Sequence, residues 1–449
     1  MDVVISNLVW IPKSEFPGSM MDSLMNRLTV YPKRTSSHQD KDPAPIELYR
    51  LKGKFIGIPR GFFIQQNRVT GIKHNVTDNT SPGHRLNLSF SGKLKEDQQR
   101  ALTAVLESIQ QGGYGGVIQA SPGWGKTVAS LGVLVSLDMS AVITVHSQFL
   151  VDQWEERIKQ FIPNARVGRI QQNKCEFGKD YDISIAMMQT LVSRHKDYND
   201  DFWDAFGVVI SDEVHHIGAP KWADVIPRFR ARYKIGLSAT PKRKDGADDV
   251  FLYHLGPILY QSKVKNVTPR LRRVFTNFKP VKTRTFDLRK ASLEVQIRHI
   301  CKNPPRNRSI VSEILKAVEH GRKVMVQSAR VKHLEILKGM FDSVKQDSVT
   351  TSYYIGGMTA DQRKQSEESD VIFATYKMTA EALDIPALDT LFLTTPVSDV
   401  TQSVGRIMRE YDGKKKPIVT DFIDEHLPMF VRMWNTRRQF YVTQGMFNG

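Results

Sequence analysis

The chain has 449 residues, of which 40% are hydrophobic and 25% charged, a composition typical of globular proteins with more than one domain. No apolar run approaches the ~18 residues that a membrane span needs, and the N-terminus lacks the pattern of a secretory signal. The two cysteines, Cys175 and Cys301, have no partners at metal-ligand spacing. We therefore expect a reducing, cytoplasmic setting and no structural zinc.

The net charge of +17 is unevenly placed. Between Gln261 and Ser309 the chain has 14 Lys and Arg, against only Asp287 and Glu294. Such a stretch attracts phosphate backbones independently of base sequence. A solvated surface that aids solubility is the alternative for a basic stretch alone, and the motifs described below favour nucleic acid.

Residues 1–90 are punctuated by Pro and Gly between short β-favouring runs, which predicts a small, mainly β accessory domain. Its 12 Lys and Arg against 7 Asp and Glu favour binding to nucleic acid, and we expect DNA. After this region, apolar strand-like runs alternate with amphipathic helical stretches, the pattern of βαβ units on a parallel sheet. We predict strands at 116–119, 141–145, 183–186, 207–211 and 234–238, and again at 323–327, 371–375, 390–394 and 417–421. The predicted fold class is α/β, with a first lobe at 91–262, a basic connector at 263–308 and a second lobe at 309–449.

A phosphate-binding loop is predicted directly after the first strand of the first lobe, where the sequence reads Ala-Ser-Pro-Gly-Trp-Gly-Lys-Thr from 120 to 127. We expect the backbone around Ser121, Gly123 and Gly125 to wrap phosphate oxygens at the N-terminus of the following helix. Lys126 would reach the β- and γ-phosphates of a nucleotide, and the Thr127 hydroxyl would bind Mg²⁺.

An acidic pair, Asp212 and Glu213, follows the predicted strand 207–211. Asp212 is suited to hold Mg²⁺ through water, and Glu213 to orient and deprotonate an attacking water. An acidic pair alone would more simply be a surface helix start, but its place after the phosphate loop, on its own strand, favours the metal. His215 and His216 have no further ligands nearby, so we reject zinc.

Far downstream, the sequence Gln-Ser-Val-Gly-Arg-Ile-Met-Arg from 402 to 409 places Arg406 and Arg409 one helical turn apart. Arginines of this kind stabilise the charge of a transferring phosphate. Neither the phosphate loop nor this segment completes a site alone, so we predict two domains that close over one nucleotide.

The ordered motifs resemble those of superfamily 2 helicases over roughly residues 93–445. The resemblance implies two tandem RecA-like lobes that use ATP and Mg²⁺. It implies that Gln98 recognises adenine, although Lys95-Glu-Asp departs from the family's usual Arg-Pro-Tyr. It also implies that Asp384 lies near the ribose or in the network that couples the two sites, that Gln402 lies near the attacking water, and that Arg406 and Arg409 face the γ-phosphate.

The same resemblance implies which loops grip a nucleic-acid strand, and backbone amides at helix starts would give a similar grip physically. Ser238-Ala-Thr240 resembles the motif that couples nucleotide state to this grip. The candidate contacts are His146, Ser147, Gln189, Thr190, Ser328, Arg330, Gly356 and Thr375.

Within the superfamily, the chain looks more like UvsW-like bacteriophage branch-migration helicases and the XPB group than like DEAD-box RNA helicases. This resemblance implies a monomeric ATP-dependent helicase or translocase that acts on branched or partly single-stranded DNA, such as forks and Holliday junctions. It would work in phage recombination, replication or repair, in the host cytoplasm. The alternatives are an RNA helicase, the motor portion of a restriction system, and a strand-annealing or clamp protein that does not hydrolyse ATP.

Overall fold

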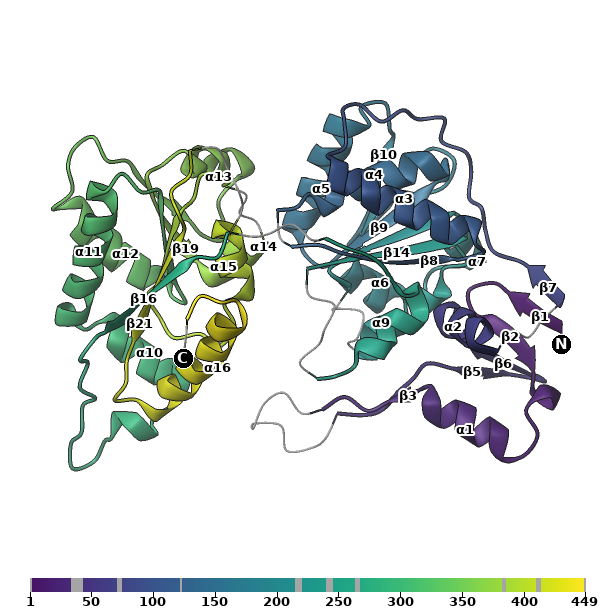
Figure 1. Ribbon diagram of the computed structural model, residues 1–449, viewed down its shortest axis with the longest axis horizontal. Helices are drawn as coiled ribbons and strands as arrows, with labels where there is room; N and C mark the ends of the chain where they lie inside the picture. The colour runs from purple at the N-terminus through teal and green to yellow at the C-terminus, as the bar shows by residue number, and fades with distance from the viewer. Residues whose placement is uncertain are drawn as a thin grey trace. The chain divides into compact units, whose positions relative to one another are not determined.

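The computed structural model consists of two compact units, Met1–Val264 (unit 1) and Lys265–Gly449 (unit 2), each described by itself below (Figure 1). The structure describes residues 2–33, 43–70, 75–121, 123–214, 220–239, 245–262, 267–381, 385–408 and 413–447.

Unit 1 begins with a small β-rich region. Its sheet has the strand order β5-β6-β2-β1-β7, with β1 (Asp2–Ile5), β2 (Val9–Pro12), β5 (Arg50–Lys52), β6 (Phe55–Ile58) and β7 (Asn75–Asp78). All its pairings are antiparallel except that of β1 with β7. The region also holds a short strand pair, β3 (Thr29–Val30) with β4 (Ile46–Glu47), a 3-10 helix (Lys13–Glu15), and the helices α1 (Ser19–Arg27) and α2 (Arg60–Thr70). The predicted mainly β character of the N-terminal residues is confirmed.

The rest of unit 1 is built on one large sheet with the order β11-β10-β12-β9-β13-β14-β8-β15. Its pairings are parallel except that of β10 with β11. The strands are β8 (Gly115–Gln119), β9 (Ala141–Val145), β10 (Val167–Gln171), β11 (Lys174–Cys175), β12 (Ile183–Met187), β13 (Val208–Asp212), β14 (Tyr233–Ser238) and β15 (Ile258–Gln261).

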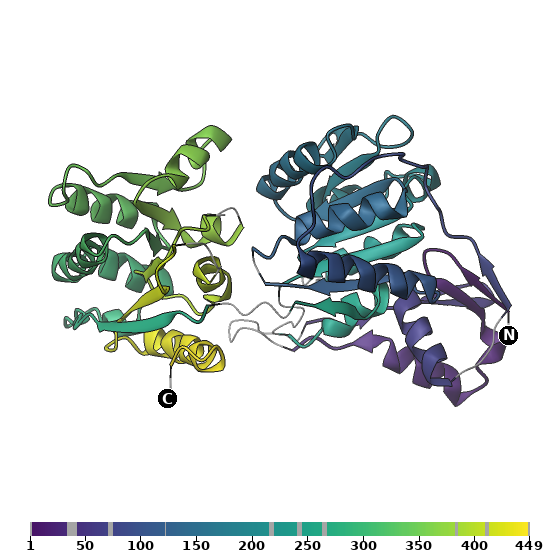
Figure 2. The same ribbon diagram turned by 45° about the horizontal axis from the view of Figure 1, so that its top comes forward.

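Helices cover both faces of this sheet, as Figures 1 and 2 show. On one face, Ile118, Ile143 and Ile210 of the strands pack in one cluster with α3 (Glu96–Gln110), α4 (Lys126–Leu137) and α5 (Gln148–Phe161). On the other, Val117, Val142 and Val209 pack with α6 (Met188–Arg194), α7 (Asp200–Asp204) and α9 (Asp248–Leu255). Successive strand residues point to opposite faces, so strands buried on both sides read as continuous apolar runs. A short helix, α8 (Pro220–Ala223), and a 3-10 helix (Ile226–Arg228) complete this part.

The N-terminal β region shares its core with the large sheet. Val3, Ile5 and Phe62 belong to the same buried cluster as Phe229 and Phe251. The two parts therefore form one hydrophobic body.

Unit 2 holds a second sheet, with the order β16-β21-β20-β17-β19-β18 and only parallel pairings. Its strands are β16 (Arg270–Phe275), β17 (Val324–Ser328), β18 (Thr351–Tyr354), β19 (Val371–Thr375), β20 (Thr390–Leu393) and β21 (Ile418–Ile423). One face is covered by α11 (Pro304–Glu319) and α12 (Val331–Asp342). The remaining helices are α10 (Leu293–Cys301), α13 (Ala360–Glu367), α14 (Tyr376–Glu381), α15 (Thr401–Ile407) and α16 (Pro428–Thr443). The predicted α/β class with two parallel sheets is confirmed.

The segment that we expected to be a basic connector, 263–308, is largely built into unit 2. β16 pairs in parallel with β21 over its whole length. Farther along, Phe278, Leu288 and Ile300 are buried in a cluster with Leu427 and Phe430 of the C-terminal part. The apolar residues of this segment are few and are separated by many cations, so its sequence pattern indicated a charged connector. The same few apolar residues are buried and determine how the segment packs.

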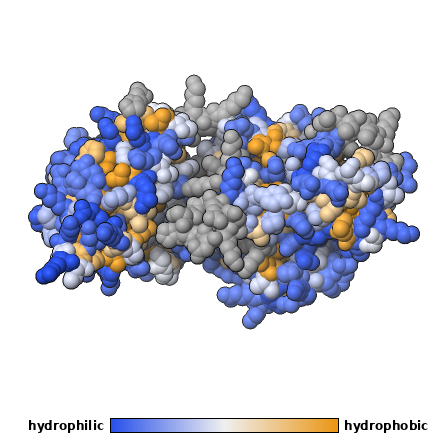
Figure 3. Space-filling model, turned by 90° about the horizontal axis from the view of Figure 1, so that it is seen from below, coloured by the Kyte–Doolittle hydropathy of each residue, from blue (hydrophilic) through white to orange (hydrophobic). Residues whose placement is uncertain are grey.

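On the face shown in Figure 3, hydrophilic residues dominate the described surface and apolar residues form small, separate patches. Within the described ranges, no helix is both long enough and apolar enough to cross a membrane.

Candidate nucleotide site and nucleic-acid loops

Three predicted motifs of unit 1 lie at the carboxyl edge of neighbouring strands. The sheet order places β14 between β13 and β8. The backbone N–H of Ala120, at the start of the phosphate loop, donates to the carbonyl oxygen of Ser238 at 3.0 Å. Asp212 pairs in register with Leu237, next to Ser238. The carboxyl edge of an open parallel sheet is where ligands of such folds bind.

The phosphate loop uses its glycines for conformations that other residues rarely adopt. Gly123 has φ of +80° and Gly125, which precedes α4, has φ of +92°. A Cβ atom at Gly125 would lie 2.4 Å from the side-chain nitrogen of Gln98. The backbone therefore approaches Gln98 as closely as only glycine allows. Pro122 lies outside the described residues, and Ser121 is half-buried.

Lys126 and Thr127 form the first turn of α4, where the positive end of the helix dipole lies. The Lys126 ammonium group donates to the carbonyl oxygen of Ala120 at 2.9 Å, so its side chain folds back along the loop. Both side chains are half-buried. A lysine, a hydroxyl and backbone N–H groups at a helix start are the groups that bind a polyphosphate.

Asp212 ends β13 with its carboxylate held by two donors. The indole N–H of Trp154 and the backbone N–H of Glu213 each donate to it at 3.0 Å. Burial raises the pKa of Asp212 to about 6, the neighbouring Glu213 carboxylate adds to the rise, and Lys126 opposes it. Glu213 has φ of +53°, a left-handed conformation that is costly for a non-glycine residue and is found mainly at functional sites.

The donor set fits Mg²⁺ rather than a transition metal. Thr127 and Asp212 offer hard oxygen atoms, and Mg²⁺ typically takes one or two protein oxygens together with water and phosphate oxygens. In the part of the chain that the structure describes, no cluster of three or more His, Cys, Asp or Glu side chains could hold a metal by itself. His215 and His216, for which we rejected zinc, lie outside the described residues.

Gln98 contacts the phosphate loop directly. Its side chain is buried, and its Nε2 donates to the carbonyl oxygens of Trp124 at 3.0 Å and Gly125 at 3.4 Å. Its Oε1 accepts from the backbone N–H of Lys95 at 3.0 Å, which completes a capping box at the start of α3. Its predicted role in adenine recognition stays a prediction.

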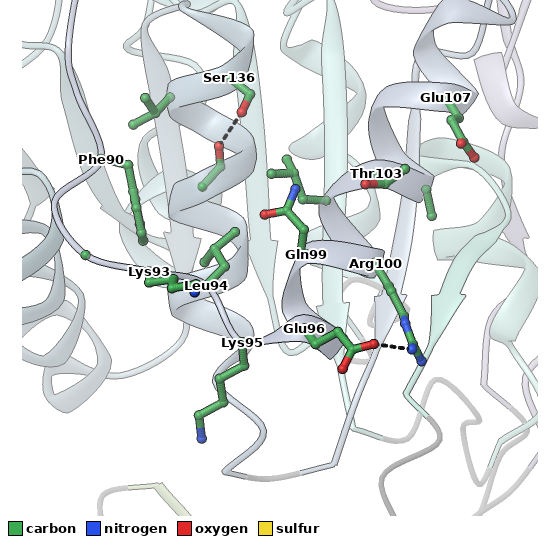
Figure 4. A pocket seen from close by; sticks show the side chains of 15 residues that line it. Phe90, Lys93, Leu94, Lys95, Glu96, Gln99, Arg100, Thr103, Glu107 and Ser136 are labelled. Atoms are coloured by element: carbon green, nitrogen blue, oxygen red, sulfur yellow. Dashed lines mark hydrogen bonds and ion pairs between the residues drawn. The ribbon is translucent and has the colours of Figure 1, made fainter.

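A groove of about 1060 Å³ runs between α3, α4 and the segment 90–95 (Figure 4). Phe90, Leu94, Gln99, Thr103 and Ser136 are among its lining residues. None of the predicted nucleotide-site residues lines it. Gln98 belongs to the same helix, but its side chain contacts the phosphate loop instead.

The structure brings two predicted nucleic-acid loops of unit 1 together. His146 follows β9, and Gln189 is the second residue of α6, directly after the neighbouring strand β12. The Gln189 side-chain amide donates to the His146 carbonyl oxygen at 2.7 Å. Ser147 caps α5, with its hydroxyl accepting from the Leu150 N–H at 3.4 Å. The hydroxyl of Thr190 is mostly buried and accepts from the backbone N–H of Gln172 at 3.1 Å. These side chains thus support the loops, and strand contact by any of them stays a prediction.

Unit 2 holds the remaining predicted contacts in different environments. Ser328 is fully buried, and its hydroxyl lies 3.0 Å from Nδ1 of His333. Arg330 forms an ion pair with Glu294 at 3.0 Å while its side chain stays 40% exposed. Gly356 is open, since a Cβ atom there would meet nothing within 4 Å. Thr375 ends β19 and is half-buried. Of these four residues, Arg330, Gly356 and Thr375 are accessible to a nucleic-acid strand, whereas Ser328 is enclosed by the fold.

Gln402 and Arg406 lie on α15, and both are half-buried. Arg409 and Asp384, two further predicted site residues, lie outside the described residues. The segment that leads from β20 into α15 is tightly held. The hydroxyl of Thr394 donates to the Gln327 carbonyl oxygen at 2.6 Å, and the Tyr376 hydroxyl donates to the Thr395 carbonyl oxygen at 2.7 Å.

Two buried ion pairs that sequence reasoning missed support the same segment. Arg306 pairs with Asp424 at 2.8 Å and donates to the Thr394 carbonyl oxygen at 2.8 Å. Arg437 of α16 makes two hydrogen bonds to Asp421, at 2.7 and 2.9 Å, and a third to the Val397 carbonyl oxygen. The sequence carries a signal in hindsight, since an acid within the apolar strand 418–423 needs a buried partner.

The chain resembles known proteins in family, in sequence and in fold. Residues 91–243 match the family model described as type III restriction enzyme, res subunit. A protein of Acanthamoeba polyphaga mimivirus, whose name assigns it to the ATP-dependent RNA helicases, is 27% identical over 97% of this chain and 84% of its own length. A protein of Escherichia phage T5, named as a helicase, is 26% identical over 68% of this chain and 67% of its own length.

Among solved structures, UvsW of phage T4 aligns over 99% of this chain and 98% of its own, with 16% identity and a TM-score of 0.39. Dbp5 of S. cerevisiae, bound to RNA and ADP BeF3, aligns over 79% of this chain and 89% of its own, with 16% identity and a TM-score of 0.54. The second likeness is one of fold. The family model and the viral relatives named as helicases confirm the predicted resemblance to helicases of this kind.

Proposed function

We propose that the chain is an ATP-driven helicase or translocase that acts on branched or partly single-stranded DNA. The observation that carries the proposal is the carboxyl edge of the first sheet. There the glycine-shaped phosphate loop with Lys126 and the acidic strand end Asp212–Glu213 flank the strand that ends in Ser238. This is an arrangement suited to bind and cleave a nucleoside triphosphate.

In this proposal each residue has a stated task. The ammonium group of Lys126 offsets phosphate charge, and the N–H groups at the start of α4 bind phosphate oxygens. Glu213 takes the proton of the attacking water. Thr127 and Asp212 would hold Mg²⁺, which when bound neutralises charge on the phosphate oxygens. Arg406 and Arg409 are proposed to supply further cations in the hydrolysing state, a contribution of the order of ~10³–10⁵ in rate for such arginines.

The nucleic-acid side of the proposal is supported by two features. In unit 1 the loops of His146 and Gln189 lie at the ends of β9 and β12, adjacent along the same sheet edge. In unit 2 an exposed basic edge is formed by β16 and the segment that follows it, with cations on both faces of the sheet: Arg272 pairs with Glu313 on one face, and Arg273 lies over the Phe447 ring on the other. Its members are Arg270, Arg272, Arg273, Lys279, Lys282 and Arg284. We name these residues the β16 basic surface, and cations on such a surface bind phosphates through counterion release.

DNA is proposed as the substrate, and RNA is the second candidate. The RNA proposal is favoured by the mimivirus relative, whose name assigns it to the RNA helicases. The DNA proposal is favoured by the resemblance of the motifs to phage branch-migration helicases. A clamp without hydrolysis is a weaker alternative, because the phosphate loop and the acidic pair are both intact. The motor of a restriction system is a further alternative, since residues 91–243 match the family model of a restriction-enzyme subunit.

The deciding experiment measures ATP hydrolysis and strand separation on matched substrates: a DNA duplex, a DNA fork, a DNA four-way junction and an RNA duplex with a single-stranded tail. We expect the DNA fork and junction to stimulate hydrolysis and to be unwound or migrated. Stimulation by RNA alone would replace the DNA proposal with the RNA one. No hydrolysis with any of these nucleic acids would reject the motor.

A further inference from the structure

Asp97, the second residue of α3, accepts three hydrogen bonds from two separate segments. The Trp124 indole N–H donates to its Oδ2 at 2.5 Å, and the Ser262 hydroxyl donates to the same oxygen at 3.0 Å. The Tyr260 hydroxyl donates to its Oδ1 in a short hydrogen bond. One carboxylate thus joins the phosphate loop to the end of β15.

The electrostatics favour an ionised carboxylate at this point. Partial burial raises the pKa of Asp97, but the hydrogen bonds from Tyr260, Trp124 and Ser262 outweigh this effect and lower the pKa overall. Asp97 also lies in the first turn of α3, where the helix dipole stabilises negative charge. An ionised carboxylate is purely an acceptor, which suits three donors that all point at it.

The neighbouring residue holds the other part of the same tryptophan. Asp97 binds the Trp124 side chain, while Gln98 binds the Trp124 and Gly125 carbonyl oxygens. Two consecutive residues of α3 therefore fix both the side chain and the main chain of the loop, directly before Lys126. A rotation of the loop around Gly125 would break these contacts together.

The other donors lie where the chain leaves unit 1. Ser262 is adjacent to the phosphate-loop strand, since its backbone N–H donates to the Gln119 carbonyl oxygen at 2.8 Å. Tyr260 pairs in register with Ile118, and its ring lies 6.0 Å from that of Trp124. Unit 2 begins at Lys265, three residues after Ser262.

We propose that Asp97 is a positioning residue that holds the phosphate loop in its nucleotide-binding conformation through Trp124, and couples it through Tyr260 and Ser262 to the chain that leads into unit 2. The proposal rests on the nucleotide-binding function proposed above. It adds a residue and a route that the motif pattern does not contain, since the sequence resemblance gave Asp97 no role. Movement of the loop on nucleotide binding would change the contacts of the departing chain through this one carboxylate.

The test replaces Asp97 by Asn, which keeps the shape but removes the charge and one acceptor oxygen. Asp97→Asn should raise the KM for ATP and the dissociation constant of a fluorescent ATP analogue by about tenfold or more, the usual effect of losing a hydrogen bond to a charged group. Glu96→Gln is the matched control. Glu96 lies in the same helical turn, its side chain is 81% exposed, and its ion pair is with Arg100. The control should change the KM by less than about twofold, because exposed pairs contribute little.

A double-mutant cycle with Trp124→Phe separates positioning from general structural damage. If Asp97 acts through the indole, Asp97→Asn should change ATP affinity much less in the Trp124→Phe background than alone. The fluorescence difference between the wild type and Trp124→Phe reports the indole itself. It should respond to ATP in the wild type and lose most of that response in Asp97→Asn.

The outcomes divide cleanly. If the wild type neither binds nor hydrolyses ATP, the proposed function fails. If the wild type is active while Asp97→Asn and Glu96→Gln behave alike, the role of Asp97 is rejected and the proposed function stands. Should Asp97→Asn fail to fold, Tyr260→Phe and Ser262→Ala, which each remove one donor, replace it. They should each raise the KM for ATP and lower the stimulation by nucleic acid, and unchanged values for both would reject the coupling.

Discussion

The buried pair of Arg437 and Asp421 leads to a prediction whose size can be worked from the structure. Both side chains are at most 2% exposed, and two hydrogen bonds join them at 2.7 and 2.9 Å. Arg437→Met removes the charged guanidinium group and keeps an unbranched apolar stem. In the part of the chain that the structure describes, Asp421 then keeps one side-chain donor, the Tyr441 hydroxyl at 2.9 Å. Leaving a buried charge without its partner costs about 3–5 kcal/mol, so unit 2 should lose that much stability.

The same variant should affect α15. Arg437 also donates to the Val397 carbonyl oxygen, in the segment that leads into α15 and its Gln402 and Arg406. We therefore expect a lower kcat for ATP hydrolysis under conditions where the variant is still folded. The assay is urea unfolding followed by circular dichroism, with peptide-resolved hydrogen exchange to assign the transition to unit 2. Exchange should increase first in peptides from 394 to 423.

Arg438→Met is the matched control, because Arg438 is the next residue on α16 and is exposed. Its guanidinium lies 5.7 Å from the Phe447 ring, a contact that contributes about 0.5–1 kcal/mol at an exposed site. A second check is Asp421→Asn in the Arg437→Met background, which removes the isolated charge and should recover part of the loss. Equal stability of the Arg437 and Arg438 variants would refute the reasoning.

The sign of the pH dependence follows from Asp421. Burial raises its pKa even with the arginine present, and removing Arg437 should raise the pKa further. A carboxyl group whose folded-state pKa lies above its unfolded value stabilises the fold at low pH and loses that contribution as the pH rises through the folded value. The deficit of Arg437→Met should therefore shrink as the pH is lowered from about 7 toward 5. A deficit that grows over this range would contradict the assignment of the charge to Asp421.

Four further predictions concern the proposed site. Lys126→Ala should abolish ATP hydrolysis and unwinding while nucleic-acid binding in a gel-shift assay stays near wild type, and unaltered turnover would defeat the motor proposal. Gly125→Ala forces a side chain into φ of +92° and toward Gln98, and should weaken ATP binding by about tenfold in a titration, whereas wild-type affinity would show that the loop is not held in this conformation. Trp154→Phe removes one donor from Asp212 and should lower kcat by about tenfold with a smaller effect on nucleic-acid affinity, an expectation rejected by an unchanged kcat. Charge reversal on the β16 basic surface, by Glu substitutions at Arg270, Arg272, Arg273 and Lys279, should weaken DNA binding. The slope of log affinity against log salt concentration should flatten by about 0.9 per lost phosphate contact. Undiminished binding at low salt would exclude this surface as a DNA contact.

The strands and the phosphate loop could be predicted because they carry strong local signals. β8, β9 and β13 are buried on both faces, so their sequences are continuous apolar runs with the motif residues directly after them. β10 and β16 give no such signal. β10 alternates half-buried and buried residues, and β16 is an edge strand with three arginines whose pairing with β21 decides its conformation.

The residues of the candidate nucleotide site could be predicted only where a local sequence motif requires one particular residue type. Lys126 and Asp212 follow from spacing, because a phosphate loop and an acidic strand end are local patterns. The hydrogen bonds that position the site join residues distant in sequence. Trp154 is 58 residues from Asp212, and Tyr260 is 163 residues from Asp97, which in turn binds the phosphate loop. Ser328 shows the opposite failure, since its motif predicts a strand contact while the fold encloses its hydroxyl beside His333.

The shared core of the N-terminal region and the first large sheet has a mechanical consequence. Val3 and Phe62 pack in one cluster with Phe229 and Phe251. The buried Lys234 side-chain nitrogen donates to the carbonyl oxygens of Ile226 at 3.1 Å and Asn7 at 3.5 Å. Because the two parts share this core, the N-terminal region cannot move independently of the first large sheet. If the N-terminal region binds a duplex arm, that arm must rotate together with the first sheet. Each rotation of the sheet would then rotate the bound DNA by the same angle.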